Sequence, residues 1–279
     1  MRLRGRRALL QGGLKAVTLL LAGGGQDIGL AQPGEARPDL RATVARARPA
    51  VLPVGTYSAT SSPRFGFRGS GFVVGDGHLL ATNAHVLPPP TEGESGPRLA
   101  VLAQTAAPGR EAGDLRFASV VAIDRTHDLA LLRLDGPALQ ALVLARGEPV
   151  AEGKSIALMG FPVGGALGFS PVTHRGIVAS VTTVALPAPS AAQLDPRAVA
   201  RLRAGNFEVL QLDATAYPGN SGGPVLDADT GEVVGVVNMV LVRGSRESAL
   251  SAPTGITYAI PVQHLHALVA EAGSNAPRR

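Results

Sequence analysis

The run of small residues from Gly219 to Pro224 contains a serine, Ser221, in a setting that suits nucleophilic chemistry. A turn of this kind lets the backbone approach a substrate and direct amide N–H groups toward it. A serine hydroxyl is a poor nucleophile at neutral pH, so it needs a nearby base and a carboxylate that orients the base. The sequence offers both, because His85 follows an apolar stretch and Asp128 opens a second apolar run. Together the three residues predict acyl transfer through a proton-relay triad.

Each of these motifs also has an ordinary structural interpretation when it is taken alone. Ser221 could cap a turn, His85 could be a hydrogen-bonded polar residue after a strand, and Asp128 could close a turn. The order His, Asp, Ser along the chain favours the catalytic interpretation, because two-barrel proteins of the chymotrypsin architecture have this order. His127 would point to the opposite face of a strand and is left out of the triad.

Five motifs resemble those of the trypsin-like serine proteases of the HtrA (DegP) type, and the resemblance extends over roughly residues 40–265. They are Gly-Ser-Gly-Phe-Val-Val (69–74), Thr-Asn-Ala-His-Val (82–86), His-Asp-Leu-Ala-Leu-Leu (127–132), Gly-Asn-Ser-Gly-Gly-Pro (219–224) and Gly-Ile-Thr-Tyr-Ala-Ile-Pro (255–261). The resemblance implies an exported serine endopeptidase that acts on unfolded or misfolded envelope proteins. No metal or organic cofactor is expected, because this acyl transfer uses side chains and backbone dipoles alone.

The resemblance implies a role for each residue of the site. Ser221 attacks the scissile carbonyl, His85 takes and returns the proton, and Asp128 orients His85. The backbone N–H groups of Ser221 and Gly219 form the oxyanion hole, and Asn220 shapes the turn between them. Two other functions stay open: a catalytically silent binding scaffold, and an esterase or self-processing hydrolase that uses the same triad.

The resemblance also places the floor of the primary substrate pocket at Thr215, six residues before the nucleophile. Threonine carries no charge, so cleavage after Lys or Arg is not expected. We expect a small or medium aliphatic residue, such as Val, Ala or Leu, at the cleavage position. The expected pocket lining consists of two short stretches, Thr215, Ala216 and Tyr217 and then Val237, Asn238 and Met239.

The chain contains no cysteine, so its fold cannot depend on disulfide bonds. A thiol nucleophile, a thiolate metal site and a lipidated cysteine anchor are excluded for the same reason. The 279 residues include 26 basic and 21 acidic side chains, a formal net charge of +5. Removal of residues 1–31 would leave 21 basic and 20 acidic side chains, a net charge of +1. The basic character therefore does not indicate a nucleic-acid partner.

The first 31 residues have the pattern of a cleavable export signal. A basic segment at 2–7 precedes a short apolar segment at 14–22, and small residues at 29–31 suit a signal peptidase. The apolar segment is too short to span a bilayer, so no stable membrane insertion is expected after its removal. The pair Arg6-Arg7 is also compatible with a twin-arginine route. We expect a periplasmic or secreted protein, and a disordered basic tail is the alternative.

Short apolar segments punctuated by glycine and proline predict an all-β fold. With the resemblance, the expected architecture is two six-stranded antiparallel β-barrels of the chymotrypsin/trypsin-like type, with short N- and C-terminal helices. The expected organisation is a signal peptide at 1–31, an N-terminal segment and first barrel at 32–150, a second barrel at 151–265, and a C-terminal helix and tail at 266–279. Asp39 is expected to cap the N-terminal helix.

Two segments depart from the pattern of the resembled family. Residues 187–205 indicate a surface insertion, either an excursion with one helix or an irregular loop. Little chain follows residue 265, so the PDZ module common in that family is not expected. His264 and His266 lie two positions apart and make a poor metal pair, because they do not share a helix face. Protein or peptide substrates are the expected partners, and the sequence leaves the oligomeric state open.

Overall fold

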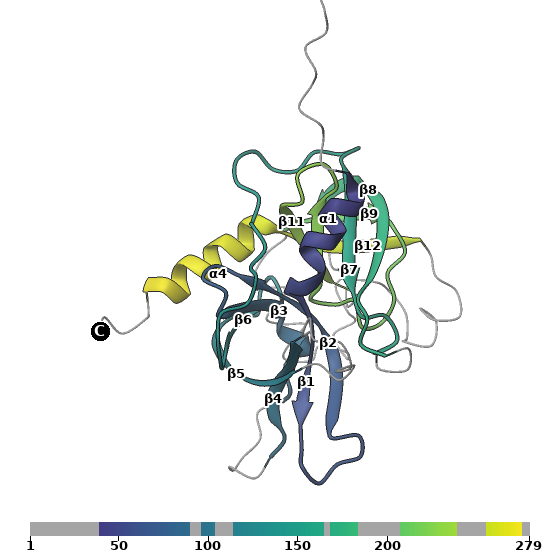
Figure 1. Ribbon diagram of the computed structural model, residues 1–279. Coiled ribbons are helices and arrows are strands. Elements are labelled where there is room, and N and C mark those ends of the chain that lie inside the picture. The colour runs from purple at the N-terminus through teal and green to yellow at the C-terminus, as the bar shows by residue number, and fades with distance from the viewer. Residues whose placement is uncertain are drawn as a thin grey trace, which may run out of the picture. The chain divides into compact units, whose positions relative to one another are not determined.

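The computed structural model describes residues 39–89, 96–103, 114–164, 168–183, 207–238 and 255–274. All of them belong to one unit of the chain, Arg37–Arg279. The described part of this unit contains two closed β-barrels (Figure 1). The predicted signal peptide 1–31, the predicted insertion 187–205 and Met239 lie outside the described residues.

The first barrel is closed by six antiparallel strands in the order β1-β2-β3-β6-β5-β4. Their bounds are β1 Val51–Tyr57, β2 Phe65–Val74, β3 Leu79–Asn83, β4 Arg98–Ala103, β5 Asp114–Asp124 and β6 Leu129–Leu134. A 3₁₀ turn, η1 (Arg48–Ala50), precedes β1, and a second, η2 (Ala84–Val86), follows β3. The second turn carries His85.

The second barrel repeats the same strand order as β7-β8-β9-β12-β11-β10, again with antiparallel pairing throughout. Its strands are β7 Ser155–Gly160, β8 Val172–Thr183, β9 Glu208–Asp213, β10 Pro224–Asp227, β11 Val233–Asn238 and β12 Ile256–Pro261. The predicted all-β architecture of two six-stranded barrels is therefore confirmed.

Branched aliphatic side chains fill both barrels, as the composition predicts. In β6, Arg133 is the single exposed residue of the apolar run. One continuous core cluster joins Phe72 of the first barrel to Met159 and Phe161 of the second. The two barrels therefore pack directly against each other. Close packing of this kind fixes the positions of the segments on both sides of the interface.

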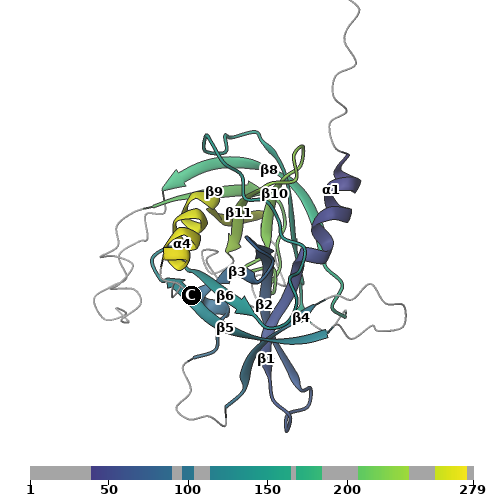
Figure 2. The same ribbon diagram turned by 60° about the vertical axis from the view of Figure 1, so that its left-hand side comes forward.

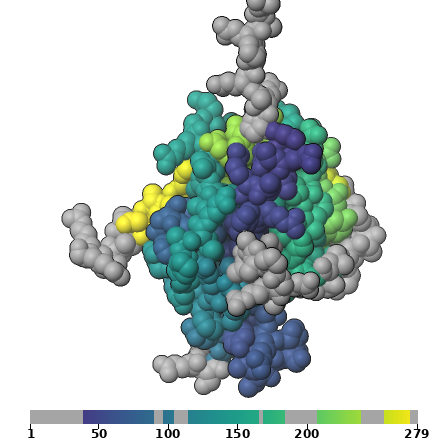
Figure 3. All heavy atoms as spheres, in the orientation of Figure 1, coloured from purple at the N-terminus to yellow at the C-terminus, as the bar shows by residue number. Residues whose placement is uncertain are grey.

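Two helices flank the barrels. Helix α1 (Leu40–Ala47) is capped by Asp39, whose carboxylate accepts the N–H of Arg41, so the predicted cap is confirmed. It lies on the surface between the linker after β6 and the second barrel (Figure 3). Arg46 fixes it there, because its side chain donates to Thr230 O and its carbonyl accepts from Gln140.

Helix α4 (Val262–Ser274) follows β12 directly and contacts β5, β6 and β11 as well as β12 (Figure 2). The helix therefore packs against both barrels. His266 donates from Nε2 to Ala145 O at 2.9 Å. Neither α1 nor α4 combines the length and the apolar character that a bilayer-crossing helix needs, and the other described residues form no such helix.

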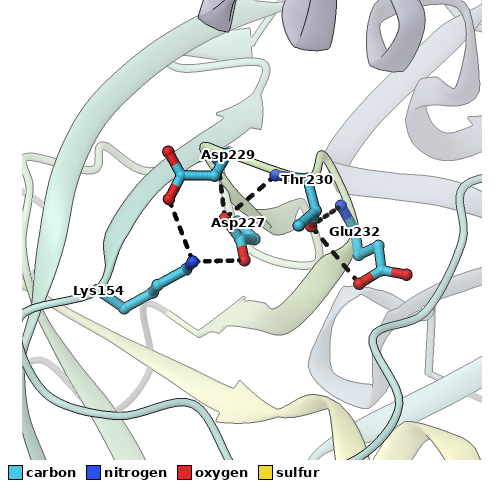
Figure 4. Close-up of polar contacts among 5 residues, drawn as sticks. All are labelled: Lys154, Asp227, Asp229, Thr230 and Glu232. Atoms are coloured by element: carbon cyan, nitrogen blue, oxygen red, sulfur yellow. Dashed lines mark hydrogen bonds and ion pairs between the residues drawn. The ribbon is translucent and has the colours of Figure 1, made fainter. Parts of the chain in front are cut away.

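A polar cluster stabilises the turn between β10 and β11 (Figure 4). Asp227 Oδ1 accepts the backbone N–H groups of Asp229 and Thr230, which closes the turn. Lys154 Nζ lies 2.8 Å from Asp227 Oδ2 and 3.3 Å from Asp229 Oδ2. The hydrogen bond that Lys154 donates to Asp227 is the main reason that the pKa of Lys154 is raised, against an opposing effect of burial. The cluster ties the start of the second barrel to its β10–β11 hairpin.

Candidate active site

His85 and Asp128 meet because β3 pairs with β6. In this ladder Asn83, the last residue of β3, lies opposite Leu129, the first residue of β6. His85 follows β3 in η2, and Asp128 immediately precedes β6, so the pairing brings the two residues to the same end of the first barrel. A separation of 43 positions along the chain becomes a direct contact.

The Asp128 carboxylate holds His85 at two points. Its Oδ1 accepts the backbone N–H of His85 at 2.9 Å, and its Oδ2 lies 2.6 Å from the imidazole Nδ1. The backbone carbonyl of Asp128 accepts Ala84 N–H at 3.0 Å and the Asn83 amide at 3.0 Å. Asp128 has φ of 55°, a left-handed conformation that aspartate adopts more readily than most residues. The aspartate therefore organises the whole turn that carries the histidine.

This geometry selects one tautomer of His85. An ionised carboxylate can only accept hydrogen bonds, so the neutral imidazole carries its proton on Nδ1 and keeps a lone pair on Nε2. The side chains of His85 and Asp128 are 30% and 26% exposed. A neutral imidazole with an available Nε2 at a partly open site is the form that a general base requires.

A second-barrel residue completes the hydrogen bonding of Asp128. The side-chain amide of Asn238, at the end of β11, donates to Asp128 Oδ2 at 2.9 Å. Asn238 is 1% exposed. We predicted it as a wall of the substrate pocket, and the structure directs its amide to Asp128. The available sequence signal was weak: a single polar residue that ends the apolar strand Val-Val-Gly-Val-Val-Asn.

The nucleophile turn, residues 219–223 with the predicted nucleophile Ser221, packs against the segment that carries His85. A β-carbon on Gly222 would lie 2.4 Å from Thr82 Oγ1 and 3.1 Å from Asn83 N. A β-carbon on Gly69 would lie 3.0 Å from Ser221 O and 2.7 Å from a methyl group of Val86. The nucleophile turn and the histidine turn are therefore in close contact at the seam of the two barrels. Ser221 itself is 6% exposed.

The backbone of the nucleophile turn is held by a series of short hydrogen bonds. Asn220 N–H donates to Tyr217 O at 3.0 Å, and Gly223 N–H donates to Asn220 O at 2.9 Å. The N–H of Gly222 donates to Val237 O at 2.9 Å, which ties the turn to β11. Asn220 is fully buried, and its side-chain amide bonds to none of the described residues. Its contribution to the turn, as far as the described residues show, is through its backbone.

Gly219 has a conformation that only glycine adopts easily, with φ of 107°. A β-carbon there would lie 2.2 Å from Phe161 O, so the close approach also requires a glycine. The preceding carbonyl, Pro218 O, accepts the N–H of Val163 at 2.8 Å. In a trans peptide the C=O and N–H point in opposite directions, so the Gly219 N–H points away from Val163. It donates to none of the described residues.

The described part of the predicted pocket lining lies beside this turn. Thr257 of β12 holds the first stretch, because its Oγ1 accepts Ala216 N–H at 3.1 Å and donates to Ala214 O at 2.6 Å. Val237 of the second stretch is fully buried and bonds through its backbone to the nucleophile turn. The Tyr217 ring lies 6.0 Å from the ring of His174, whose pKa is lowered by burial.

His127 adjoins Asp128 in the chain, but its ring contacts other residues. Its Nδ1 contacts Asp124 Oδ2, and its ring stacks on His264 of α4 at a centroid distance of 3.7 Å. Phe207 packs edge-on against His127 at 4.9 Å. Within the described ranges no group of three or more His, Asp or Glu side chains is placed to hold a metal ion. The stacking of His127 on His264 attaches the turn before Asp128 to the C-terminal helix.

Comparisons with known proteins identify the family to which the chain belongs. The trypsin-like peptidase domain family matches residues 69–236. Serine protease HTRA1 from Xenopus laevis is 29% identical over 204 residues, which cover 73% of this chain and 36% of that protein. A probable periplasmic serine endoprotease DegP-like from Halomonas elongata is 28% identical over 194 residues, which cover 70% and 32%.

A crystal structure of the serine endoprotease from Yersinia pestis has the same fold, with a TM-score of 0.58 at 23% identity over 86% of this chain and 69% of that chain. The chain spans about a third of the length of the curated relatives it matches. The family match covers more than half of the chain. Those relatives are serine proteases of the HTRA and DegP-like types, and the family match shows that the chain belongs to the trypsin-like peptidase family.

Proposed function

We propose that this chain is an exported serine endopeptidase that hydrolyses peptide bonds in unfolded or misfolded proteins. The observation that carries the proposal is the double hold of Asp128 on His85, at 2.9 Å to the backbone N–H and 2.6 Å to Nδ1. Closing a turn would need only the first contact, whereas the pair also sets the tautomer and direction of the imidazole. Membership of the trypsin-like peptidase family supports the same activity.

The proposed reaction proceeds through an acyl-enzyme. Ser221 Oγ attacks the scissile carbonyl carbon while its proton passes to Nε2 of His85, and the carbonyl oxygen becomes an oxyanion. His85 then donates this proton to the leaving amine, which breaks the C–N bond and leaves the acyl group on Ser221. Water repeats the sequence with His85 as its base, which releases the carboxylic acid and restores the serine. Asp128 stays ionised and stabilises the imidazolium.

The proposed oxyanion hole consists of the backbone N–H groups of Gly219 and Ser221. The direction of the Gly219 N–H, set by the hydrogen bond between Val163 N–H and Pro218 O, supports this role. Preorganised donors of this kind are worth about 3 kcal/mol each in the transition state, because they need no reorganisation when charge develops. The amide of Asn238 supports catalysis from the other side by holding Asp128.

The proposed specificity is for a small or medium aliphatic residue at the cleavage position. Thr215, Ala216, Tyr217 and Val237 carry no charge that could select Lys or Arg. Release into the periplasm or outside the cell follows from the pattern of residues 1–31. The similarity to a protein described as a probable periplasmic endoprotease supports that location.

The test compares the purified chain with Ser221→Ala and with Ser58→Ala, in which a partly exposed serine of the β1–β2 loop is replaced. We expect a fluorophosphonate to label the wild type and Ser58→Ala equally and Ser221→Ala not at all. Casein, an unfolded substrate, should be degraded by the same two proteins. Asp128→Asn should fold and lose about 10⁴-fold in rate, because its amide no longer selects the productive imidazole tautomer.

Each alternative function predicts a different result in these assays. Ser221-dependent labelling and ester hydrolysis with intact casein would favour a narrow esterase or self-processing hydrolase. If wild type and Ser221→Ala are both labelled only at the background level, and casein stays intact with both, a binding scaffold is favoured. Peptide libraries cleaved mainly after Arg or Lys would contradict the proposed specificity while leaving the triad in place.

A further inference from the structure

Ser70 connects the first barrel to the nucleophile turn of the second. It lies in β2 and is fully buried. Its hydroxyl donates to Gly219 O at 2.6 Å and accepts the N–H of Phe161 at 3.0 Å. Its backbone N–H donates to Ser221 O at 2.8 Å. One residue of the first barrel therefore holds the carbonyls of Gly219 and Ser221, the two neighbours of Asn220 in the chain.

Gly219 lies between two peptide units, and hydrogen bonds fix the direction of each. Pro218 O accepts from Val163 N–H on one side, and Gly219 O accepts from the Ser70 hydroxyl on the other. A glycine has little steric preference for one orientation of its peptide units over another. Hydrogen bonds rather than side-chain sterics must therefore decide where the Gly219 N–H points.

Ser70 is itself held by the strand that leads to the histidine. Thr82 Oγ1, in β3, donates to Ser70 O at 2.7 Å. Gly222 packs so closely on Ser70 O that a β-carbon there would lie 2.2 Å away. Ser70 is therefore held by β3, which leads to the turn that carries His85. It also packs against the turn that carries Ser221.

We propose that Ser70 is a positioning residue whose hydroxyl holds the Gly219–Asn220 peptide, so that the oxyanion hole is formed before substrate binds. Its catalytic consequence rests on the proposed peptidase function. Ser70 touches no reacting atom and acts through Gly219. Serine suits this place because one buried hydroxyl can donate to one backbone group and accept from another at the same time. Alanine would leave Gly219 O and Phe161 N–H without this partner.

The test uses Ser70→Ala with two matched controls in the full chain. Thr43→Val removes a buried hydroxyl of α1 that bonds to none of the described residues, and it should leave the kinetics unchanged. Thr257→Val removes a hydroxyl with the same pattern as Ser70, one bond donated and one accepted, but beneath the proposed pocket. Thr257→Val should therefore raise KM for a peptide amide more than it lowers kcat.

Ser70→Ala should show the opposite split between kcat and KM. We expect kcat to fall by roughly ten-fold with KM within about three-fold of wild type, because the donor is present but aligned less often. This loss is smaller than the roughly 10²- to 10³-fold cost of removing an oxyanion donor outright. Affinity for a peptide aldehyde, whose adduct places an oxyanion in the hole, should fall by the same factor as kcat/KM.

A second readout does not depend on catalysis. In amide NMR spectra recorded in the Ser221→Ala background, Ser70→Ala should shift or broaden the signals of Gly219 and Asn220. Hydrogen exchange at Asn220 N–H should also become faster, whereas Thr43→Val should change neither. A kcat within two-fold of wild type, or unchanged Gly219 and Asn220 signals, would overturn the proposed role of Ser70.

The two readouts separate failure of this inference from failure of the proposed function. If the wild type shows no Ser221-dependent hydrolysis or labelling, the peptidase proposal fails. The NMR signals then still decide whether the Ser70 hydroxyl orients the Gly219 peptide. If hydrolysis depends on Ser221 but is unaffected by Ser70→Ala, the peptidase proposal stands and the positioning role is refuted.

Discussion

Replacement of Asn238 should uncouple the triad acid from the second barrel. Asn238→Ala removes the amide that donates to Asp128 Oδ2 at 2.9 Å, and Asn238→Asp places a second carboxylate at the same point. A hydrogen bond to a charged group contributes about 1.5–3 kcal/mol. If that energy orients Asp128 in the transition state, its loss lowers kcat by about 10- to 100-fold.

Asn238→Asp should be the more damaging of the two variants. Two carboxylates within hydrogen-bond distance cannot both stay ionised, so one must take up a proton or turn away. Either response weakens the hold on the imidazole of His85, which lies 2.6 Å from the same Oδ2. Lowered kcat with little change in KM is expected for both variants, because Asn238 contacts the acid rather than the scissile bond.

The assay is steady-state hydrolysis of a fluorogenic peptide with an aliphatic residue at the cleavage position. Thermal unfolding of each variant confirms that it folds. Gln140→Ala is the matched control, because it removes an exposed amide that donates to Arg46 O, away from the triad. A folded Asn238→Ala with kcat within two-fold of wild type would refute the idea that the second barrel positions the acid.

Two further predictions concern stability rather than rate. Asp227→Ala should lower the free energy of unfolding by about 1–3 kcal/mol, because it leaves two turn N–H groups without their acceptor and Lys154 with Asp229 alone of its two carboxylates. Chemical denaturation measures the loss. Burial and then the nearby His127 lower the pKa of His264, so the folded protein disfavours its protonation. Stability should therefore decrease as pH falls below about 6.5, the ordinary histidine pKa, and His264→Phe should make this decrease smaller.

Both stability predictions have clear controls. Thr230→Ala keeps the Asp227 carboxylate and should cost less than Asp227→Ala, and the reverse order would contradict the role given to Asp227. For the pH series, burial lowers the pKa of His174 as well, so part of the dependence should persist in His264→Phe. An identical slope between pH 5 and 7 in wild type and His264→Phe would show that His264 contributes nothing.

Asp124, the carboxylate that contacts His127, affects stability in a different pH range. Burial tends to raise the pKa of Asp124, but hydrogen bonds and charge from His127 outweigh it and lower the pKa overall. The stability that Asp124 contributes is fully present above the ordinary pKa of 3.8. It is lost as the pH falls through the lower pKa of the folded state. The effect of Asp124 therefore lies below the range in which the histidines act.

Much of the fold could be predicted because it rests on local patterns. Short apolar runs between glycine- and proline-rich turns indicated strands at places such as 129–134 and 155–160, where β6 and β7 lie. The cap at Asp39 was predictable for the same reason, since it involves residues two positions apart. Motif order along the chain then indicated that His85 and Asp128 would meet.

Other contacts between elements could not be predicted from these patterns. Nothing local distinguishes Asn238 as a partner of Asp128 rather than a pocket residue, because the two lie 110 positions apart. Ser70 sits in a glycine-rich strand and meets Gly219 across 149 positions. His127 shares its turn with Asp128, yet its ring stacks on a helix near the C-terminus.

By itself the sequence determined the strand segments and the turn chemistry, and it predicted the three residues proposed to carry out acyl transfer. Tertiary structure decided which atoms face one another: the double hold on His85, the Asn238 amide on Asp128 and the Ser70 hydroxyl under the nucleophile turn. The physical reason is that strand periodicity and turn preferences act over a few residues, whereas closing and docking two barrels sets the distances between residues that are far apart in the chain.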